Sequence, residues 1–203
     1  RLLSQAISFY GEHGSKDFNE KNPVKKNNKI NTKIYKTIFK EKQLDELIKK
    51  LNEKSVIAVD TETSSLNPQE ADLVGISLCY ETNEAFYIPV GHTEKTELKK
   101  DIVLKKLKPL LEDPSIKKVG QNIKYDFIIF KNHGIELSSV EDTMLLSYTL
   151  DAGNNRHNMD TLSELHLGHK TISYKELVGT GKKQLNFSEV DLKSATEYAA
   201  EDA

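Results

Sequence analysis

The chain has 203 residues, enough for one well-buried core with a small appendage. With 29 basic and 31 acidic residues its net charge is −2, so bulk charge gives no attraction to DNA or to anionic lipid, and any nucleic-acid contact must depend on a local patch. Charged residues make up 30% of the chain and no apolar run approaches the roughly 18 residues of a membrane-spanning helix, which excludes a helical membrane protein.

Cysteine content and the N-terminal residues limit which kinds of protein the chain can be. Cys79 is the only cysteine, which excludes an internal disulfide and a cysteine-based zinc site and fits a reducing compartment. The chain begins with Arg1 rather than Met and has no signal peptide, so we expect a piece of a longer protein. Residues 1–34 are typical of a linker or of the tail of an upstream domain, segments that are often disordered, because they run into a Lys-rich stretch without acids. An arm that touches DNA is the alternative, and residues 35–203 are expected to form the folded domain.

The first part of this domain is predicted to hold one helix and then three strands. Leucine and isoleucine recur at helical spacing within residues 41–52. Three apolar runs follow at residues 55–61, 73–80 and 85–90. A short polar turn joins the last two runs, which favours antiparallel pairing between them.

The second part of the domain alternates between strands and helices. Helical patterns cover residues 97–111 and 122–132, on either side of a short strand at residues 117–120. Three strands followed by this alternation predict an α/β fold in layers with a mixed sheet. Further helices are predicted at residues 142–150, 160–167 and 188–202.

The tripeptide Asp60-Thr61-Glu62 ends the most apolar of the predicted strands. Side chains at positions i and i+2 of a strand share a face, so Asp60 and Glu62 point the same way. Two carboxylates side by side at the end of a buried strand repel each other, and a hard divalent cation relieves that cost. The alternative is that Thr61-Glu62 begins a solvated loop while Asp60 caps a turn.

Two further acids occupy helix ends. Asp126 lies near the start of the helix at residues 122–132, where the alternative role is to complement the helix dipole. Asp202 follows Tyr198 by four residues and shares its helical face, where the alternative is a surface helix with a partly packed tyrosine. Glu201 points about 100° around the helix from Asp202 and is therefore the weaker candidate ligand.

Taken in order, the chain shows an apolar strand ending in DTE, a QNxxxD pattern at a helix start and a YxxxD pattern at a helix end. This order resembles the DEDD superfamily of 3′–5′ exonucleases, in the branch with a tyrosine before the last aspartate. Successive segments, among them AVDTETSSLNP, VGQNIKYD and EYAAEDA, resemble the proofreading domain of bacterial family A DNA polymerase I over roughly Tyr35 to Ala203. The resemblance implies an RNase H-like three-layer α/β fold with a central mixed sheet flanked by helices, and a 3′–5′ exonuclease activity on DNA.

The resemblance also implies roles for individual residues. Asp60, Glu62, Asp126 and Asp202 match the metal-binding carboxylates, and Tyr198 matches the tyrosine that orients the attacking water. Six other residues match positions expected to lie near DNA, and one of them departs from the usual Phe. These residues are Leu66, Gln121, Asn122, Arg156, His157 and Tyr174, the last being the departure.

Cofactors and partners follow from the same resemblance. Two divalent cations are expected, Mg²⁺ with Mn²⁺ as a substitute, because the ligands are oxygens without cysteine or paired histidines. The expected substrate is a single-stranded or frayed DNA 3′ end, cleaved to nucleoside 5′-monophosphates during replication and repair. We further expect a polymerase domain in the same parent chain beyond the last helix, a monomer, and a cytoplasmic, nucleoid-associated location. The alternatives are a catalytically weak or inactive spacer domain of the polymerase and an RNA-trimming relative.

Overall fold

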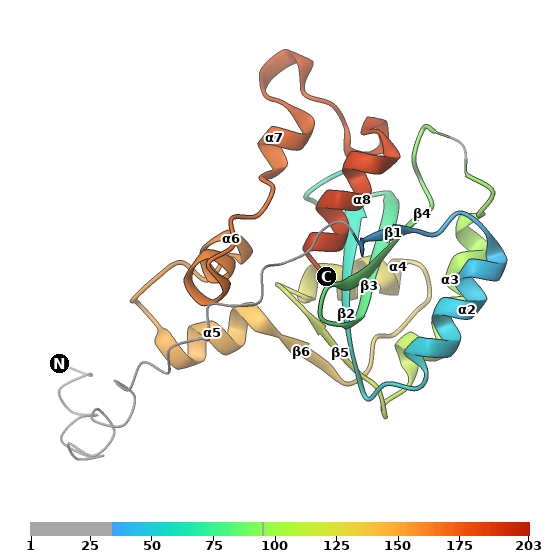
Figure 1. The fold of residues 1–203 in the computed structure, drawn as a ribbon, viewed down its shortest axis with the longest axis horizontal. Helices are drawn as coiled ribbons and strands as arrows, with labels where there is room; N and C mark the ends of the chain where they lie inside the picture. The colour runs from blue at the N-terminus through green and yellow to red at the C-terminus, as the bar shows by residue number, and fades with distance from the viewer. Residues whose placement is uncertain (1–33, 95) are drawn as a thin grey trace.

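The structure is a computed structural model that describes residues 34–94 and 96–203. The predicted linker or tail lies, but for Ile34, outside the described residues. Within the described part, six strands form one sheet in the order β1-β4-β3-β2-β5-β6, with helices on both faces (Figure 1). None of the helices in these residues has the length and apolar character that crossing a membrane requires.

Three antiparallel strands form the centre of the sheet. β2 (Val56–Thr63) pairs with β3 (Leu73–Glu81), and β3 pairs with β4 (Glu84–Pro89) across the turn that the sequence predicts. The pairing of β2 with β3 shifts register between Glu62 and Thr63. A shift of this kind bends a strand locally, and here it falls directly after the two acids of β2.

Parallel pairing extends the sheet on both sides of this centre. β5 (Lys117–Gly120) lies beside β2, β6 (Val140–Asp142) lies beside β5, and β1 (Lys36–Thr37) lies beside β4. The mixed sheet that the sequence predicts is therefore confirmed. The strands β1 and β6 are not predicted from the sequence, because two or three residues are too few to show an alternation.

One face of the sheet carries α2 (Glu41–Leu51), α3 (Lys100–Glu112) and α4 (Lys124–Asn132). Their apolar stripes pack with Ile57 and Val59 of β2 in the larger of two hydrophobic cores. Burial of such stripes supplies most of the stability of short helices, so these three helices form where the periodicity predicts them.

The opposite face is covered by α8 (Leu192–Glu201), which lies in front of the strands in Figure 1. Ala195 and Ala199 pack with Tyr87 of β4 in the second, smaller core. Because side chains alternate along a strand, Asp60 and Glu62 of β2 point to this face while their apolar neighbours point to the other. The predicted three-layer arrangement, helices on both faces of a mixed sheet, is confirmed.

Between β6 and α8 the chain makes an excursion away from the sheet (Figure 1). It holds α5 (Thr143–Asp151), α6 (Met159–Leu162) with a π-helical turn η3 (Ser163–Leu167), and then α7 (Tyr174–Val178). Helices predicted at residues 142–150 and 160–167 are thus present, the second ending as a π turn. The short α7 is not predicted by periodicity, although Ser173 and Glu176 form a capping box at its start.

The excursion ends with two 3₁₀ turns, η4 (Gly181–Lys183) and η5 (Phe187–Glu189). The helix predicted at residues 188–202 begins later, at Leu192, because the Asp191 side chain accepts a hydrogen bond from the Ser194 N–H and caps it there. We call residues 169–190 the α7 arm, since they lead from η3 out through α7 and back to α8.

Gly75 of β3 permits a close approach next to the acids of β2. It pairs with Glu62, and a Cβ at this position would lie 2.0 Å from the hydroxyl oxygen of Tyr87. Tyr87 is fully buried, and its hydroxyl is 2.7 Å from His92 Nε2. Because glycine has no side chain, the Tyr87 ring can pack against the backbone of Gly75, next to Glu62.

Gly75→Ala should lower the free energy of unfolding by about 1–3 kcal/mol, because the new methyl group must displace the buried Tyr87 ring. Denaturant unfolding measures the change. Ser77→Ala is the matched control, since it removes a buried hydroxyl that has no hydrogen-bond partner in the described structure and should leave stability unchanged or raise it. Equal stability of Gly75→Ala and the parent protein would contradict the close approach.

Candidate active site

Three carboxylates meet at the end of β2. Oxygen atoms of Asp60, Glu62 and Asp202 all lie within 4.8 Å of one another. β2 contributes the first two, and the residue that caps the C-terminal end of α8 contributes the third. Glu62 is buried, whereas Asp60 and Asp202 are partly exposed. The structure thus brings together three of the four acids that the sequence singles out, and Glu62 does not begin a solvated loop.

The fourth acid, Asp126, reaches the site from the other face of the sheet. It lies buried in the first turn of α4, and Thr61 Oγ1 donates a hydrogen bond to its Oδ1 at 2.5 Å. Thr61 stands between the two acids of β2 and points the opposite way. Asp126 therefore lines the same cleft without joining the three-oxygen cluster. Sequence reasoning missed Thr61, although its position between two acids of a strand could have identified it.

Burial raises the pKa of all four acids. Burial is the largest cause in each case, and for Asp60 and Glu62, whose pKa rises well above the usual range, the neighbouring carboxylates add to it. The pKa of Asp126 and that of Asp202 rise to about 7. A nearby positive charge would stabilise the ionised form of carboxyl groups that resist ionising together at neutral pH, and an all-oxygen donor set fits a hard divalent cation. The residues present therefore fit the metal that the exonuclease resemblance implies.

Tyr198 lies one turn before Asp202 on α8 and lines the same cleft. Burial, followed by the charge of Asp202, raises the pKa of its phenol above the ordinary value of 10, so the hydroxyl stays protonated at neutral pH. Its ring packs against Phe187 and Tyr174, with centroids 5.9 and 6.1 Å away. The Tyr198 ring is therefore partly packed, as the surface-helix alternative expected. It also lies beside the acids, as the exonuclease resemblance implies.

Apolar side chains are exposed in the same cleft. Leu66, in the loop after β2, is 96% exposed. Tyr174, at the start of α7, is 40% exposed and stacks on Phe187 with ring planes 9° apart. Such faces can hold nucleobases without regard to sequence. Phe187 was not singled out from the sequence, because nothing in the pattern shows which ring supports Tyr174.

The cleft that holds these residues has a volume of about 740 Å³, within the range of ligand-binding pockets. It brings nine of the eleven residues that the resemblance assigns to one place. The nine residues are Asp60, Glu62, Leu66, Gln121, Asn122, Asp126, Tyr174, Tyr198 and Asp202.

Gln121 and Asn122 connect β5 to α4 at the edge of the cleft. The Gln121 side chain is used within the protein, because its Nε2 donates to the His157 carbonyl at 2.7 Å and its Oε1 accepts from Thr143 Oγ1 at 2.5 Å. Asn122 has a φ of +55°, and its N–H donates to Asp142 Oδ1 at 3.0 Å. Gln121 therefore connects the cleft to the excursion through its hydrogen bonds. The left-handed backbone of Asn122 turns the chain just before α4 begins, at the edge of the cleft.

Arg156 and His157 do not line the cleft. Arg156 is exposed on the excursion. His157 Nδ1 lies 2.9 Å from Ser147 Oγ, and its ring packs edge-on against Tyr148 at 5.3 Å. The structure thus gives His157 partners inside the excursion, and a DNA contact at either residue stays a prediction.

Comparison with known families decides the assignment. The family model described as 3′–5′ exonuclease matches residues 35–203. The chain belongs to the 3′–5′ exonuclease family. It is 44% identical to DNA polymerase I of Pseudomonas aeruginosa over 175 residues and 42% identical to DNA polymerase I of Rhizobium leguminosarum over 189 residues. Each match covers 83% of this chain and 19% of the relative, so the chain spans about a fifth of the length of these relatives. The resemblance to the exonuclease domain of DNA polymerase I is confirmed, and this family implies the use of divalent metal.

Solved structures share the fold of this exonuclease domain. Escherichia coli RNase D superposes with a TM-score of 0.61 at 23% identity, covering 83% of this chain and 41% of that one. The EXO domain of Aedes aegypti Nibbler superposes with a TM-score of 0.64 at 15% identity, covering 87% and 85%. At these identities the likeness concerns the fold alone, and it confirms the RNase H-like architecture.

In a chelator, the stability of the domain should fall as the pH rises from about 4 to 7. Asp126 and Asp202 release their protons near pH 4 in the unfolded chain but only near pH 7 in the fold, so the folded state is favoured while they are protonated. Added Mg²⁺ should therefore raise the melting temperature more at pH 8 than at pH 5.5.

Thermal unfolding with and without Mg²⁺ measures both effects. Asp60→Asn combined with Glu62→Gln is the control, because it removes two charges from the cluster while keeping the side-chain shapes. This variant should lose the stabilisation by Mg²⁺ and be less sensitive to pH in chelator. A shift with Mg²⁺ as large as that of the parent protein would argue against a cation at these acids.

Proposed function

We propose that this domain removes nucleotides one at a time from the 3′ end of DNA and releases nucleoside 5′-monophosphates. The observation that carries the proposal is the convergence of Asp60, Glu62 and Asp202 beside Tyr198, in a cleft with exposed apolar side chains. Membership of the 3′–5′ exonuclease family and relatives named DNA polymerase I favour DNA as the substrate.

The four acids would hold two divalent ions. Asp60, Glu62 and Asp202 would hold one ion, and Asp126 with Asp60 would hold the other. When bound, Mg²⁺ activates a water molecule and stabilises the charge that develops on the leaving 3′ oxygen. Oxygen ligands alone favour Mg²⁺ and also accept Mn²⁺. Thr61 would keep Asp126 at a fixed orientation through its 2.5 Å hydrogen bond.

The remaining residues orient the reactants. The Tyr198 oxygen would form a hydrogen bond with the attacking water and aim it at the phosphorus, a task that needs no ionised phenol. Leu66 and Tyr174 would contact the terminal bases through apolar faces that tolerate any sequence. Such tolerance suits an enzyme that must accept every terminus, matched or mismatched.

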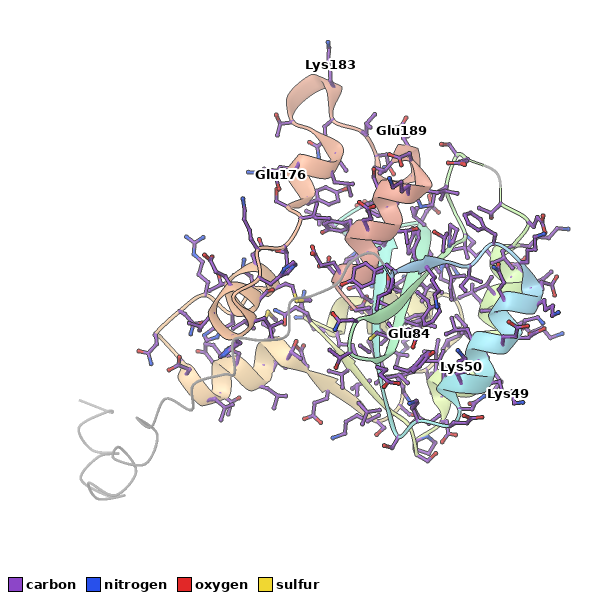
Figure 2. All side chains as sticks on the ribbon, in the orientation of Figure 1. Lys49, Lys50, Glu84, Glu176, Lys183 and Glu189 are labelled. Carbon is purple, nitrogen blue, oxygen red and sulfur yellow. The ribbon has the colours of Figure 1, made fainter. Side chains whose placement is uncertain are left out.

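Positive charge for the DNA backbone would come from the α7 arm. Lys175 lines the cleft, and Lys183 extends from the tip of the arm, away from the sheet (Figure 2). A local source of this kind is needed because the net charge of the chain is −2. Since the relatives are about five times longer than the matched region, a polymerase domain in the same parent chain would supply the DNA end.

Asp60→Ala combined with Glu62→Ala should abolish hydrolysis while the domain stays folded, because the change removes two of the three clustered carboxylates and creates no buried charge. Digestion of a 3′-labelled single-stranded DNA with Mg²⁺, and with chelator as the blank, measures the loss. Activity of the double variant equal to that of the parent would rule out the proposed ligands.

Tyr198→Phe should retain the ring packing and lower kcat by roughly a hundredfold.

A DNA strand and an RNA strand of equal sequence distinguish the proposed function from an RNA-trimming one. The proposal expects kcat/KM to be higher on the DNA 3′ end. A preference for RNA would reassign the substrate while keeping the same acids. No hydrolysis of either strand by the folded protein with Mg²⁺ or Mn²⁺ would favour the alternative of a spacer domain.

A further inference from the structure

Glu201 is a buried acid beside the carboxylate cluster that takes no part in it. It directly precedes Asp202, yet its side chain is only 3% exposed and does not join the cluster. Both of its oxygens have partners: Oε1 is 2.6 Å from His169 Nε2, and Oε2 accepts a hydrogen bond from the Ile172 N–H at 2.7 Å. We call these three residues the Glu201 clamp.

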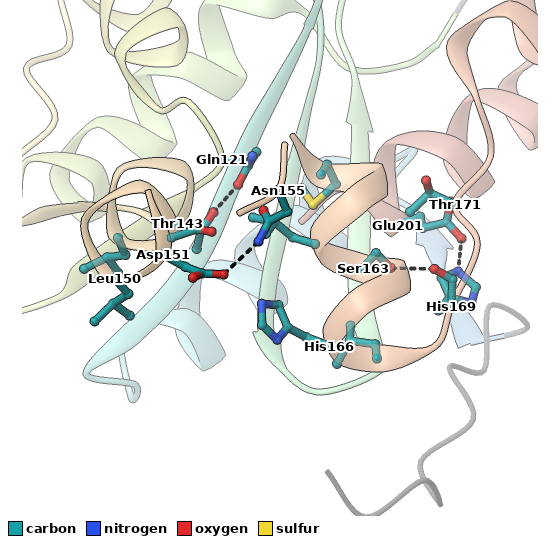
Figure 3. Close-up of a pocket in the computed structure, with 15 residues that line it drawn as sticks. Gln121, Thr143, Leu150, Asp151, Asn155, Ser163, His166, His169, Thr171 and Glu201 are labelled. Carbon is teal, nitrogen blue, oxygen red and sulfur yellow. Dashed lines mark hydrogen bonds and ion pairs between the residues drawn. The ribbon is translucent and has the colours of Figure 1, made fainter. Parts of the chain in front are cut away.

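The partners of Glu201 belong to the first residues of the α7 arm. Ser163 Oγ of η3 donates to the His169 carbonyl at 3.0 Å, and Thr171 Oγ1 donates to Asp160 Oδ1 at 2.7 Å. Figure 3 shows Glu201, His169 and Thr171 grouped at one end of a pocket next to α6 and η3. The start of the arm is therefore held from two sides, by α6 with η3 and by the end of α8.

The clamp joins two parts of the active site. On one side, Asp202 caps α8, at a helix end where backbone carbonyls lack helical partners and the chain frays unless side chains or packing hold it. On the other side, Tyr174 begins α7 only two residues after Ile172. A single buried side chain thus connects the end of α8 that carries Asp202 to the segment that leads into Tyr174.

We propose that Glu201 is a positioning residue, which fixes Asp202 in the acid cluster and at the same time sets the α7 arm, with Tyr174, over the cleft. This inference rests on the proposed function and adds to it a residue that touches neither the ions nor DNA. Loss of the clamp should weaken the hold on the cation through Asp202 and the hold on the terminal bases through Tyr174.

Two variants of Glu201 and a matched control test the clamp. Glu201→Ala removes both contacts, whereas Glu201→Gln keeps the shape, an oxygen for the Ile172 N–H and an NH₂ group that can donate to His169. Glu197→Gln is the matched control, because Glu197 is an exposed acid one turn earlier on the same helix. If Glu201→Ala does not fold, His169→Ala, which removes one of the two contacts, replaces it.

Exonuclease assays on 3′-labelled single-stranded DNA give kcat, KM and the Mg²⁺ concentration for half-maximal rate. Glu201→Ala should lower kcat/KM by about ten- to hundredfold, the range of a lost hydrogen bond to a charged group, and raise the Mg²⁺ requirement. Glu201→Gln should recover most of the loss, and Glu197→Gln should match the parent. A folded Glu201→Ala with parental kcat, KM and Mg²⁺ requirement would overturn the proposal, as would a Glu201→Gln that is equally impaired.

Hydrogen exchange separates this proposal from the proposed function. The Ile172 amide and the first turn of α7 should exchange faster in Glu201→Ala than in the parent, whether or not the parent hydrolyses DNA. If the parent protein is inactive but exchange is faster in Glu201→Ala, the proposed function is refuted. The Glu201 clamp is then a structural contact only. Unchanged exchange would show that Glu201 does not hold the arm.

Discussion

Repulsion between carboxylates is the interaction on which the rest of this structure depends. Asp60, Glu62 and Asp202 lie within a few ångströms of one another on the inner side of α8, where burial opposes the ionisation of all three and the neighbouring carboxylates add to it for Asp60 and Glu62. A fold that keeps such a group together must hold each acid by its backbone, because the side chains themselves would separate. β2 fixes two acids in a central strand of the sheet, and the packing of Ala195 and Ala199 on that sheet fixes the third through α8.

The site uses both faces of the sheet at one strand end. The acids of β2 point toward α8, while Thr61 between them points toward α4 and holds Asp126. The register shift after Glu62 ends the regular pairing at this place, so the loop with Leu66 can leave the sheet next to the acids. Gly75 has no side chain, and Tyr87 therefore fills the space beside Glu62. The α7 arm then brings Tyr174 to the cleft from outside the layers, with its ring stacked on the buried Phe187.

Local patterns account for what the sequence predicts well, and long-range packing for what it does not. The alternation of β2 is enough to put Asp60 and Glu62 on one face, and helical spacing is enough to relate Tyr198 to Asp202. That these two pairs meet follows from the family resemblance, because no periodicity reports which strand α8 covers. The bond from Thr61 to Asp126, the stacking of Phe187 under Tyr174 and the partners of Glu201 depend on contacts between distant segments. Short elements such as β1, β6 and α7 lack the length for a detectable pattern.

Asp126 and Asp202 are partly protonated near neutral pH until a cation binds beside them. Titration calorimetry of the protein with Mg²⁺ at pH 7, in two buffers that differ in ionisation enthalpy, counts the protons exchanged with the buffer on binding. Because the pKa of Asp126 and that of Asp202 lie at about 7 without metal, we predict that Mg²⁺ binding releases protons, and fewer of them at pH 8 than at pH 7. Binding without proton release at pH 7, or no binding of Mg²⁺ at all, would contradict the central claim that crowded acids are held here for a metal ion.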